Sequence, residues 1–350
     1  MSFDLNILGV KENIPKVSFT EYSGLLAGIP KIGKTTLASL YDNCILLACE
    51  IGYKAKKINV RDIKKWEDMK DFTSLLEDNR EEIGDDVQTI VIDTVDRLYP
   101  YAQDYVVKRY NRRKSPEAPR AENIGDIPHG KGWSDGDKEF LCEISKILNL
   151  GFTFLFLTHN KIKTITPKNG IPYDVYYPTM PERCSAVIYP LVDFILNMQR
   201  TAVLQDGEMI NKRELILRGN EMANGGSRVG SMNERIIFDT EEEAILKFKE
   251  SFKKAIEEEI QKNDKSIDIP KLEAQQKVEK DVLVKENLKI SVELPNIIKE
   301  IKAVIKEKLK SKTINNNHIL NVMSTFNVSS PDEIKDSETA NTMLEEFKKA

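Results

Sequence analysis

The sequence predicts an α/β fold with a mainly parallel sheet between helices, followed by a small all-helical C-terminal domain. Short apolar runs alternate with amphipathic stretches up to about residue 240, a pattern typical of a parallel sheet that is covered on both faces. The composition then changes, because every Gly and every Cys lies before residue 240, whereas the remainder holds 20 Lys, 22 acidic residues and no Arg. The 350 residues are enough for two domains.

The predicted strands are short apolar runs at 24–27, 44–48, 89–92, 152–158, 194–199 and 214–218. Helical periodicity covers 34–41, 66–79 and 138–150. Two long polar connections, 109–133 and 160–184, interrupt this alternation. Because connections of this length are usually functional or disordered in a compact domain, we expect them to be surface segments with a role or without fixed structure.

The C-terminal part has helical patterns throughout. Residues 241–262 predict one long charged helix, 271–289 a weakly patterned linker, and 294–310, 315–326 and 339–349 three further helices. The predicted domains are therefore an α/β domain at 1–240, a charged helix with linker at 241–290, and a small helical domain at 291–350.

The cysteines and the apolar runs indicate an intracellular protein without a membrane segment. Cys44, Cys49, Cys142 and Cys184 lack the paired spacing of a zinc site and are too few for a disulfide framework. The N-terminus is too polar for a signal peptide, and runs such as 152–157 are too short to cross a bilayer.

A phosphate-binding loop follows the first strand and consists of Gly28, Ile29, Pro30, Lys31, Ile32, Gly33, Lys34, Thr35 and Thr36. Its two glycines allow the backbone angles that turn amide N–H groups toward phosphates. Lys34 is expected to reach the β- and γ-phosphates, and the Thr35 hydroxyl to bind Mg²⁺. The flanking strand and helix fit this motif, so we expect the cofactors to be ATP and Mg²⁺.

Two acidic residues at strand ends are candidates for the rest of the site. Asp93 ends the apolar run TIVID, where it can hold the water shell of the metal. Asp96 is consistent with either a helix N-terminal acid or a catalytic group, and Asp93 is preferred. Glu50 follows the strand at 44–48 and can orient or deprotonate the attacking water, unless it is a loop residue without a task.

Thr158 and His159 lie at the end of a further predicted strand. A lone histidine is more often structural. Its position beside three other strand ends of the site nevertheless favours a role in sensing the γ-phosphate and in passing that state to the next loop.

This ordered set resembles the RecA-like ATPases, and in particular the phage-encoded RecA-core ATPases described as nucleotide-binding or single-strand-annealing proteins. The matching segments are GIPKIGKTT, ACEIG, TIVIDTVDRL, HGKGW, FLTHNK and RGNEMANGGSR, which lie between residues 20 and 235. The resemblance implies that Glu50 is the catalytic glutamate, that Lys34 and Thr35 hold phosphate and metal, that Asp93 is the second acidic residue, and that His159 is the γ-phosphate sensor.

The resemblance also implies partners. The loop at 161–181 would contact single-stranded DNA, in a homo-oligomer that acts in phage recombination in the host cytoplasm, beside a single-strand-binding protein. Arg183, Arg218 and Arg228 are candidates for an intersubunit cationic finger, each with an alternative as a salt-bridge or surface residue. The C-terminal helices loosely resemble small modules attached to unrelated phage recombination proteins, or are a bundle that aids solubility or assembly.

The charge balance restricts any nucleic-acid site to a local surface, because 52 Lys and Arg face 56 Asp and Glu for a net charge of −4. One candidate cluster is the run from Lys108 to Lys114. The other combines lysines and tyrosines, namely Lys161, Lys163, Lys168, Tyr173, Tyr176 and Tyr177. Basic groups with aromatic rings suit single strands, whereas a solvated surface is the alternative for either cluster.

Three functions are therefore considered. The first is a DNA-stimulated ATPase that promotes annealing or strand exchange on single-stranded DNA. The second is a nucleotide or small-molecule kinase with a lid at 109–120, which the Thr-His strand end disfavours. The third is a loading or assembly factor in which ATP binding acts as a switch.

Overall fold

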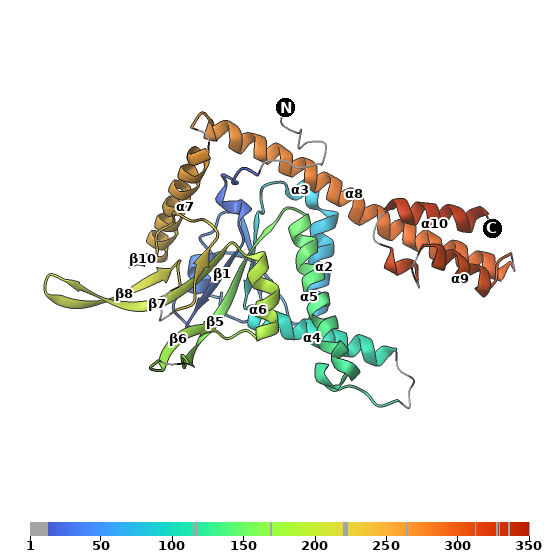
Figure 1. Ribbon diagram of the computed structural model, residues 1–350, viewed down its shortest axis with the longest axis horizontal. Helices are drawn as coiled ribbons and strands as arrows, with labels where there is room; N and C mark the ends of the chain where they lie inside the picture. Colours follow the sequence, from blue (N-terminus) through green and yellow to red (C-terminus); the bar gives the residue numbers. More distant parts are fainter. Residues whose placement is uncertain are drawn as a thin grey trace. The chain divides into compact units, whose positions relative to one another are not determined.

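The computed structural model describes residues 13–349, except 114, 116, 117, 169, 220–222, 264, 312, 327, 329, 335 and 336. The described residues up to Lys277 form one compact unit, and those from Val278 onward form a second. The first unit holds a mixed, mainly parallel sheet with helices on both sides (Figure 1). The α/β fold predicted from the sequence is confirmed.

The parallel part of the sheet consists of β1 (Gly24–Gly28), β2 (Cys44–Ala48), β3 (Asn59–Asp62), β4 (Thr89–Asp93), β5 (Thr153–Ile165) and β7 (Phe194–Gln205). These strands lie in the order β3-β2-β4-β5-β1-β7, and each pair of neighbours is parallel. Successive residues of one strand point to opposite faces, and Leu25 and Leu26 of β1 are both fully buried. Both faces of the sheet are therefore covered, as the apolar runs predict.

Antiparallel strands extend this sheet at two places. Beside β7 lie β8 (Glu208–Ile216) and the short β9 (Gly226–Ser227), and β10 (Arg235–Phe238) pairs with β8. β6 (Tyr173–Pro178) pairs with the second half of β5. Two hairpins, β5–β6 and β7–β8, consequently project beyond the layers of the fold (Figure 1).

One face of the sheet is covered by α2 (Trp66–Asp78), α4 (Val95–Arg112) and α5 (Lys131–Asn149), which contact one another. Trp66 and Tyr99 pack on the Phe140 ring at their centre. The shorter helical segments of this unit are Phe19–Glu21, α3 (Arg80–Ile83), Ile124–Asp126, Pro128–Gly130, α6 (Glu182–Ile188) and Tyr189–Leu191.

The opposite face is covered by α1 (Lys34–Ala38) and α7 (Glu241–Asn263). The composition change at residue 240 predicts that this charged helix lies outside the α/β domain. In the structure Phe248 and Phe252 of α7 are buried against Phe194 of β7. The helix belongs to the sheet's core because its apolar residues form one stripe, while its charges occupy the remaining surface.

The predicted linker at 271–289 is also helical, since it lies within α8 (Ile269–Lys310). Its Lys, Glu, Gln and Leu are strong helix formers, which explains a helix without a regular apolar pattern. The second unit contains the rest of α8 with α9 (Asn316–Thr325), the turn Pro331–Glu333 and α10 (Ser337–Lys349). Its own core includes Ile301, Met323, Met343 and Phe347. None of the described helices is both long enough and apolar enough to span a bilayer.

Candidate functional site

The strand order brings the predicted site residues to one edge of the sheet. β5 lies between β1 and β4, and Gly28 is in register with His159. Asp93 is in register with Leu157 on one side and Ala48 on the other. The carboxyl ends of parallel strands meet at one edge, where open α/β sheets bind ligands.

A hollow of about 510 Å³ opens at this edge. It is lined by Pro30, Lys31, Gly33, Lys34, Thr35, Thr36, Glu50, Ile51, Gly52, Lys56, Asp93 and His159. The structure thus brings together the phosphate loop, both predicted acids and the predicted sensor. Three residues of the predicted loop do not line the hollow. Gly28 ends β1, Ile32 is buried in the core, and Ile29 is partly buried against that core.

The two glycines of the loop are needed for close approach. Gly33 has a φ of 116°, and a Cβ at this position would collide with the carboxylate of Glu241. A Cβ on Gly28 would lie 2.8 Å from the backbone oxygen of Met198. The helix that follows is shorter than predicted, because α1 ends at Ala38.

A clamp behind the loop was missed by sequence reasoning. Arg213 of β8 donates from Nη1 to the backbone oxygen of Ile32 at 3.2 Å and to Glu241 Oε1 at 2.6 Å. Glu241 is the first residue of α7, so two elements from beyond the motif hold the loop. No local pattern marks Arg213, because its contact with Ile32 joins residues 181 positions apart.

Lys34 is held in place by carbonyl groups. Its Nζ donates to the backbone oxygens of Gly28 at 2.7 Å and Ile29 at 3.1 Å, and it lies 3.2 Å from His159 Nδ1. Burial lowers the pKa of Lys34 to about 8, although the negative charges of Asp93 and Asp96 oppose this shift. An ammonium group only donates, so Nδ1 of His159 accepts and its other ring nitrogen carries the hydrogen.

The two predicted metal ligands, Thr35 and Asp93, are hydrogen-bonded to each other. Thr35 Oγ1 donates to Asp93 Oδ2 at 2.7 Å. Burial raises the pKa of Asp93, and the hydrogen bond from Thr35 opposes this shift. Among the described residues no group of three or more His, Cys, Asp or Glu side chains could hold a metal. One hydroxyl and one carboxylate do fit Mg²⁺, which commonly completes its shell with phosphate oxygens and water.

Glu50 lies on the loop after β2 and is oriented by three partners from other elements. Its Oε1 accepts from Thr94 Oγ1 at 3.1 Å and lies 3.5 Å from Arg97 Nε, and its Oε2 accepts from His159 Nε2 at 3.4 Å. Burial raises the pKa of Glu50, but the hydrogen bonds from His159 and Thr94 and the charge of Arg97 outweigh it. The net pKa lies below the ordinary 4.5. Glu50 is therefore ionised at neutral pH and can accept a proton.

Asp96 positions His159, which lies in the middle of β5 rather than at the strand end that the sequence predicts. Its Oδ1 accepts from Thr158 Oγ1 at 3.1 Å and from Thr179 Oγ1 at 2.5 Å, and its Oδ2 accepts from the His159 amide at 3.4 Å. The Thr179 amide in turn donates to the His159 backbone oxygen at 2.8 Å. Asp96 does not line the hollow. It instead fixes the middle of β5 to the segment that follows β6.

The connection predicted as a DNA-contacting loop at 161–181 is largely the β5–β6 hairpin. Its lysines at 161, 163 and 168 are exposed, and Lys163 Nζ lies 4.8 Å from the ring centroid of Tyr177. Tyr173 is 40% exposed. The hairpin therefore presents cations and aromatic rings together on an exposed strand pair.

The other predicted basic cluster is partly used by the fold itself. Residues 108–112 form the end of α4 and Arg113 follows it, and Arg109 Nη1 pairs with Glu139 Oε2 at 2.6 Å. Lys108, Arg112 and Arg113 are exposed. Lys114 lies outside the described residues, as do residues 220–222 of the RGNEMANGGSR segment.

The finger candidates differ in their contacts. Arg183 pairs with Asp137 at 2.5 Å, and Arg228 pairs with Asp193 at 3.2 Å. No hydrogen bond or ion pair of the Arg218 side chain occurs within the described part of the chain. A further cation that sequence reasoning missed is Lys56, which lines the hollow from the loop after β2.

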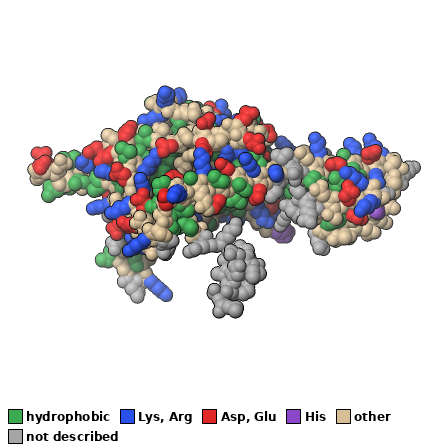
Figure 2. Space-filling model, turned by 90° about the horizontal axis from the view of Figure 1, so that it is seen from above, with side chains coloured by type: hydrophobic (Ala, Val, Ile, Leu, Met, Phe, Trp, Pro, Cys, Tyr) green, Lys and Arg blue, Asp and Glu red, His purple; other side chains and the backbone are tan. Residues whose placement is uncertain are grey.

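The surface charge agrees with the sequence balance. Figure 2 shows basic and acidic side chains interspersed over the face in view, rather than one extended basic field. Any contact with nucleic acid therefore rests on local groups such as those of the β5–β6 hairpin.

The part of the chain that holds the hollow is similar to known proteins. A sequence model described as an AAA domain matches residues 20–229, which include every residue that lines the hollow. The chain is also similar to the SPbeta prophage-derived uncharacterized protein YorG of Bacillus subtilis (strain 168), with 28% identity over 185 residues. That match covers 52% of this chain and 52% of YorG, so the similarity spans about half the length of the relative.

Proposed function

We propose that this chain, which belongs to the AAA domain family, is a RecA-like ATPase that acts on single-stranded DNA in phage recombination. Family membership supports nucleotide binding and hydrolysis, and the prophage origin of YorG supports the phage setting. The observation that carries the finer proposal is that His159 contacts both Lys34 and Glu50. His159 lies in β5, and this strand continues into the β5–β6 hairpin.

The hydrolysis step follows from the positions of the charged groups. Lys34 leaves its carbonyl partners and neutralises the β- and γ-phosphates. Mg²⁺ held by Thr35 and Asp93 would neutralise further phosphate charge. Glu50 accepts a proton from the attacking water while the water oxygen bonds to the γ-phosphorus and the bond to the β-phosphate oxygen breaks. Lys56 lies in the same loop after β2 as Glu50 and adds positive charge to the wall of the hollow.

The same residues provide a route from nucleotide to DNA. The γ-phosphate competes with His159 for Lys34, because both accept a hydrogen bond from its ammonium. The resulting shift of His159 passes to the hairpin through its backbone contacts with Thr179 and Asp96. The lysines and tyrosines of the hairpin suit a single strand, whose phosphates and base faces are both available. Annealing or strand exchange would then be controlled by the nucleotide.

Assembly completes the proposal. A homo-oligomer would align the hairpins along a strand, with Arg218 as the candidate finger toward the next subunit and with a single-strand-binding protein as a partner. Alignment matters because one chain of net charge −4 offers only a local basic surface.

The test combines DNA binding with hydrolysis. Anisotropy of a fluorescein-labelled oligothymidylate should report tighter binding with ATPγS and Mg²⁺ than with ADP, and the oligonucleotide should stimulate phosphate release. Lys161→Ala with Lys163→Ala should weaken DNA binding about tenfold and remove the stimulation, while basal hydrolysis persists. Lys253→Ala with Lys254→Ala is the matched control, because it removes the same charge from exposed positions of α7.

Other outcomes would redirect the proposal. Equal DNA affinity in both nucleotide states, with hydrolysis intact, would reject the DNA function and retain the ATPase. DNA activity that survives in Glu50→Gln after hydrolysis stops would identify a nucleotide-gated loading factor. Phosphate transfer to an added nucleotide would identify a kinase.

A further inference from the structure

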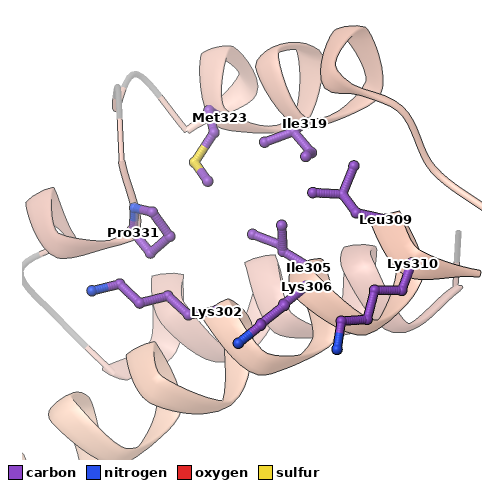
Figure 3. Close-up of a pocket in the computed structure, with 8 residues that line it drawn as sticks. All are labelled: Lys302, Ile305, Lys306, Leu309, Lys310, Ile319, Met323 and Pro331. Atoms are coloured by element: carbon purple, nitrogen blue, oxygen red, sulfur yellow. The ribbon is translucent and has the colours of Figure 1, made fainter. Parts of the chain in front are cut away.

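The second compact unit carries an apolar hollow of about 520 Å³ between α8 and α9, here called the C-terminal groove (Figure 3). Ile305 and Leu309 project into it from α8, and Ile319 and Met323 from α9. Pro331 stands at one end. Two helices therefore supply a floor made of aliphatic and thioether groups.

The groove stays open although the unit has a complete core of its own. Phe347 and Met343 of α10 and Ile301 of α8 are fully buried in that core. Leu309 is nevertheless 38% exposed at the groove. It is not an isolated apolar residue, because Ile305, Ile319 and Met323 line the same hollow, and a contiguous apolar surface of this kind suits a partner.

One rim of the groove is basic. Lys302, Lys306 and Lys310 follow one another at intervals of four on α8, a spacing that places them on one side of the helix. Lys302 Nζ is bound by Asp332 at 2.6 Å. Within the described part of the chain, Lys306 and Lys310 form no ion pair, and the residues that line the groove include no acid.

We propose that the C-terminal groove binds an acidic amphipathic segment of a partner protein. The apolar side chains of such a segment would cover the floor, and its carboxylates would meet Lys306 and Lys310. Recognition of an amphipathic helix by an apolar groove follows this scheme, with anchors three or four residues apart. The volume lies within the range of about 300–1,000 Å³ that is usual for binding pockets.

The lining favours a peptide over nucleic acid. Single strands are held by stacking on aromatic rings as well as by phosphate contacts. The described residues that line the groove are aliphatic or basic, or are methionine and proline, and none is aromatic. A bound phosphate backbone would engage the lysines and leave the apolar floor in water.

The test uses the full-length chain and a fluorescein-labelled acidic peptide of sequence ELLDELLEDLLE, whose leucines share one helical face. Anisotropy should show saturable binding that weakens at high salt, because exposed charge pairs are screened. A peptide with Lys at the acidic positions should bind at least about tenfold more weakly, since like charges would oppose each other at the rim.

Two kinds of variant locate the peptide. Leu309→Asp should weaken binding about tenfold or more, because it removes an apolar anchor from the floor and places a carboxylate beside the acidic peptide. Leu320→Asp is its matched control on α9, because Leu320 is 64% exposed and does not line the groove. Lys306→Glu with Lys310→Glu leaves the apolar floor intact, so it tests the site even if Leu309→Asp disturbs folding.

Each contrary result would overturn the proposal. Binding that is absent, or that is equal in the wild type, the Leu309→Asp variant and the charge-reversal variant, places no acidic segment in the groove. Displacement of the peptide by oligothymidylate, with a larger loss of DNA than of peptide affinity in the charge-reversal variant, would assign the groove to nucleic acid. Self-association that Leu309→Asp abolishes would assign it to a second copy of the chain.

Discussion

The two hollows have nearly equal volumes, about 510 and 520 Å³, and opposite chemistry. The hollow lined by the phosphate loop, Glu50, Asp93 and His159, here called the nucleotide hollow, gathers charged and polar groups from β1, β2, β4 and β5 and from the loops after them. Its key polar atoms are already hydrogen-bonded to one another. The C-terminal groove gathers apolar groups from α8 and α9, and part of this floor faces water, with Leu309 38% exposed. In the absence of a charged ligand, the charged groups of its site pair with one another, because an unpaired buried charge is costly. The apolar groups of an open groove can instead remain in contact with water.

The largest expected effect is in the nucleotide hollow. Lys34→Ala should weaken ATPγS binding at least about 100-fold, because a charge-assisted contact to the phosphates is lost. Titration calorimetry measures this affinity, with Lys253→Ala as a control that removes an exposed charge from α7. Because Lys34 does not line the C-terminal groove, binding of the acidic peptide should be unchanged. Unaltered ATPγS affinity would show that Lys34 does not contact the phosphates.

The next effect separates catalysis from binding within the same hollow. Glu50→Gln keeps the shape of the side chain but removes its ability to accept a proton, so single-turnover hydrolysis should fall about 100- to 1,000-fold. ATPγS affinity should stay within about threefold of the wild type. Glu250→Gln, an exposed position on α7, is the matched control. Hydrolysis at the wild-type rate would remove Glu50 from the catalytic role.

The smallest effect is a pH dependence that only the nucleotide hollow should show. Burial lowers the pKa of Lys34 to about 8, and bound phosphate favours its charged form. Binding above pH 8 must therefore take up a proton, so the Kd for ATPγS should be constant below this pH and rise up to about tenfold per unit above it. Calorimetry in buffers of different ionisation enthalpy detects that proton.

The lowered pKa of Lys34 has the opposite effect on the stability of the nucleotide-free chain, which rises with pH where the affinity for ATPγS falls. Between pH 8 and the ordinary Lys value of 10.5, the unfolded chain holds more protons than the folded one, so the Lys34 contribution to stability rises with pH. A Kd that is unchanged from pH 7 to above pH 9 would contradict both statements.

Much of the nucleotide hollow could be predicted because its signals are local. The phosphate loop is a continuous motif, and Asp93, Glu50 and His159 each follow a short apolar strand. The residues that sequence reasoning missed lack such signals. Thr179 is one of them, because its hydrogen bond to Asp96 joins residues 83 positions apart, so only the paired strands and helix α4 bring them together.

The fold beyond the parallel strands was less predictable for the same physical reason. β8 carries several charged residues and its role depends on pairing with β7, which no local pattern specifies. The composition change at 240 suggested a boundary there. Phe248 and Phe252, four residues apart, nevertheless pack on the sheet, because one buried stripe is enough to attach a charged helix.

β5 has a mechanical consequence. Its first half is buried in register with β1 and β4, and from Asn160 to Ile165 it pairs with β6 alone. His159 therefore lies where the buried half of β5 meets the projecting half. The nucleotide hollow is beside it, and about 20 Å of strand extends beyond it, at roughly 3.3 Å per residue. A rotation of about 5° at His159 would move the far end by about 2 Å over that length. If the hairpin holds single-stranded DNA as proposed, a rotation too small to disturb the core would therefore displace that DNA.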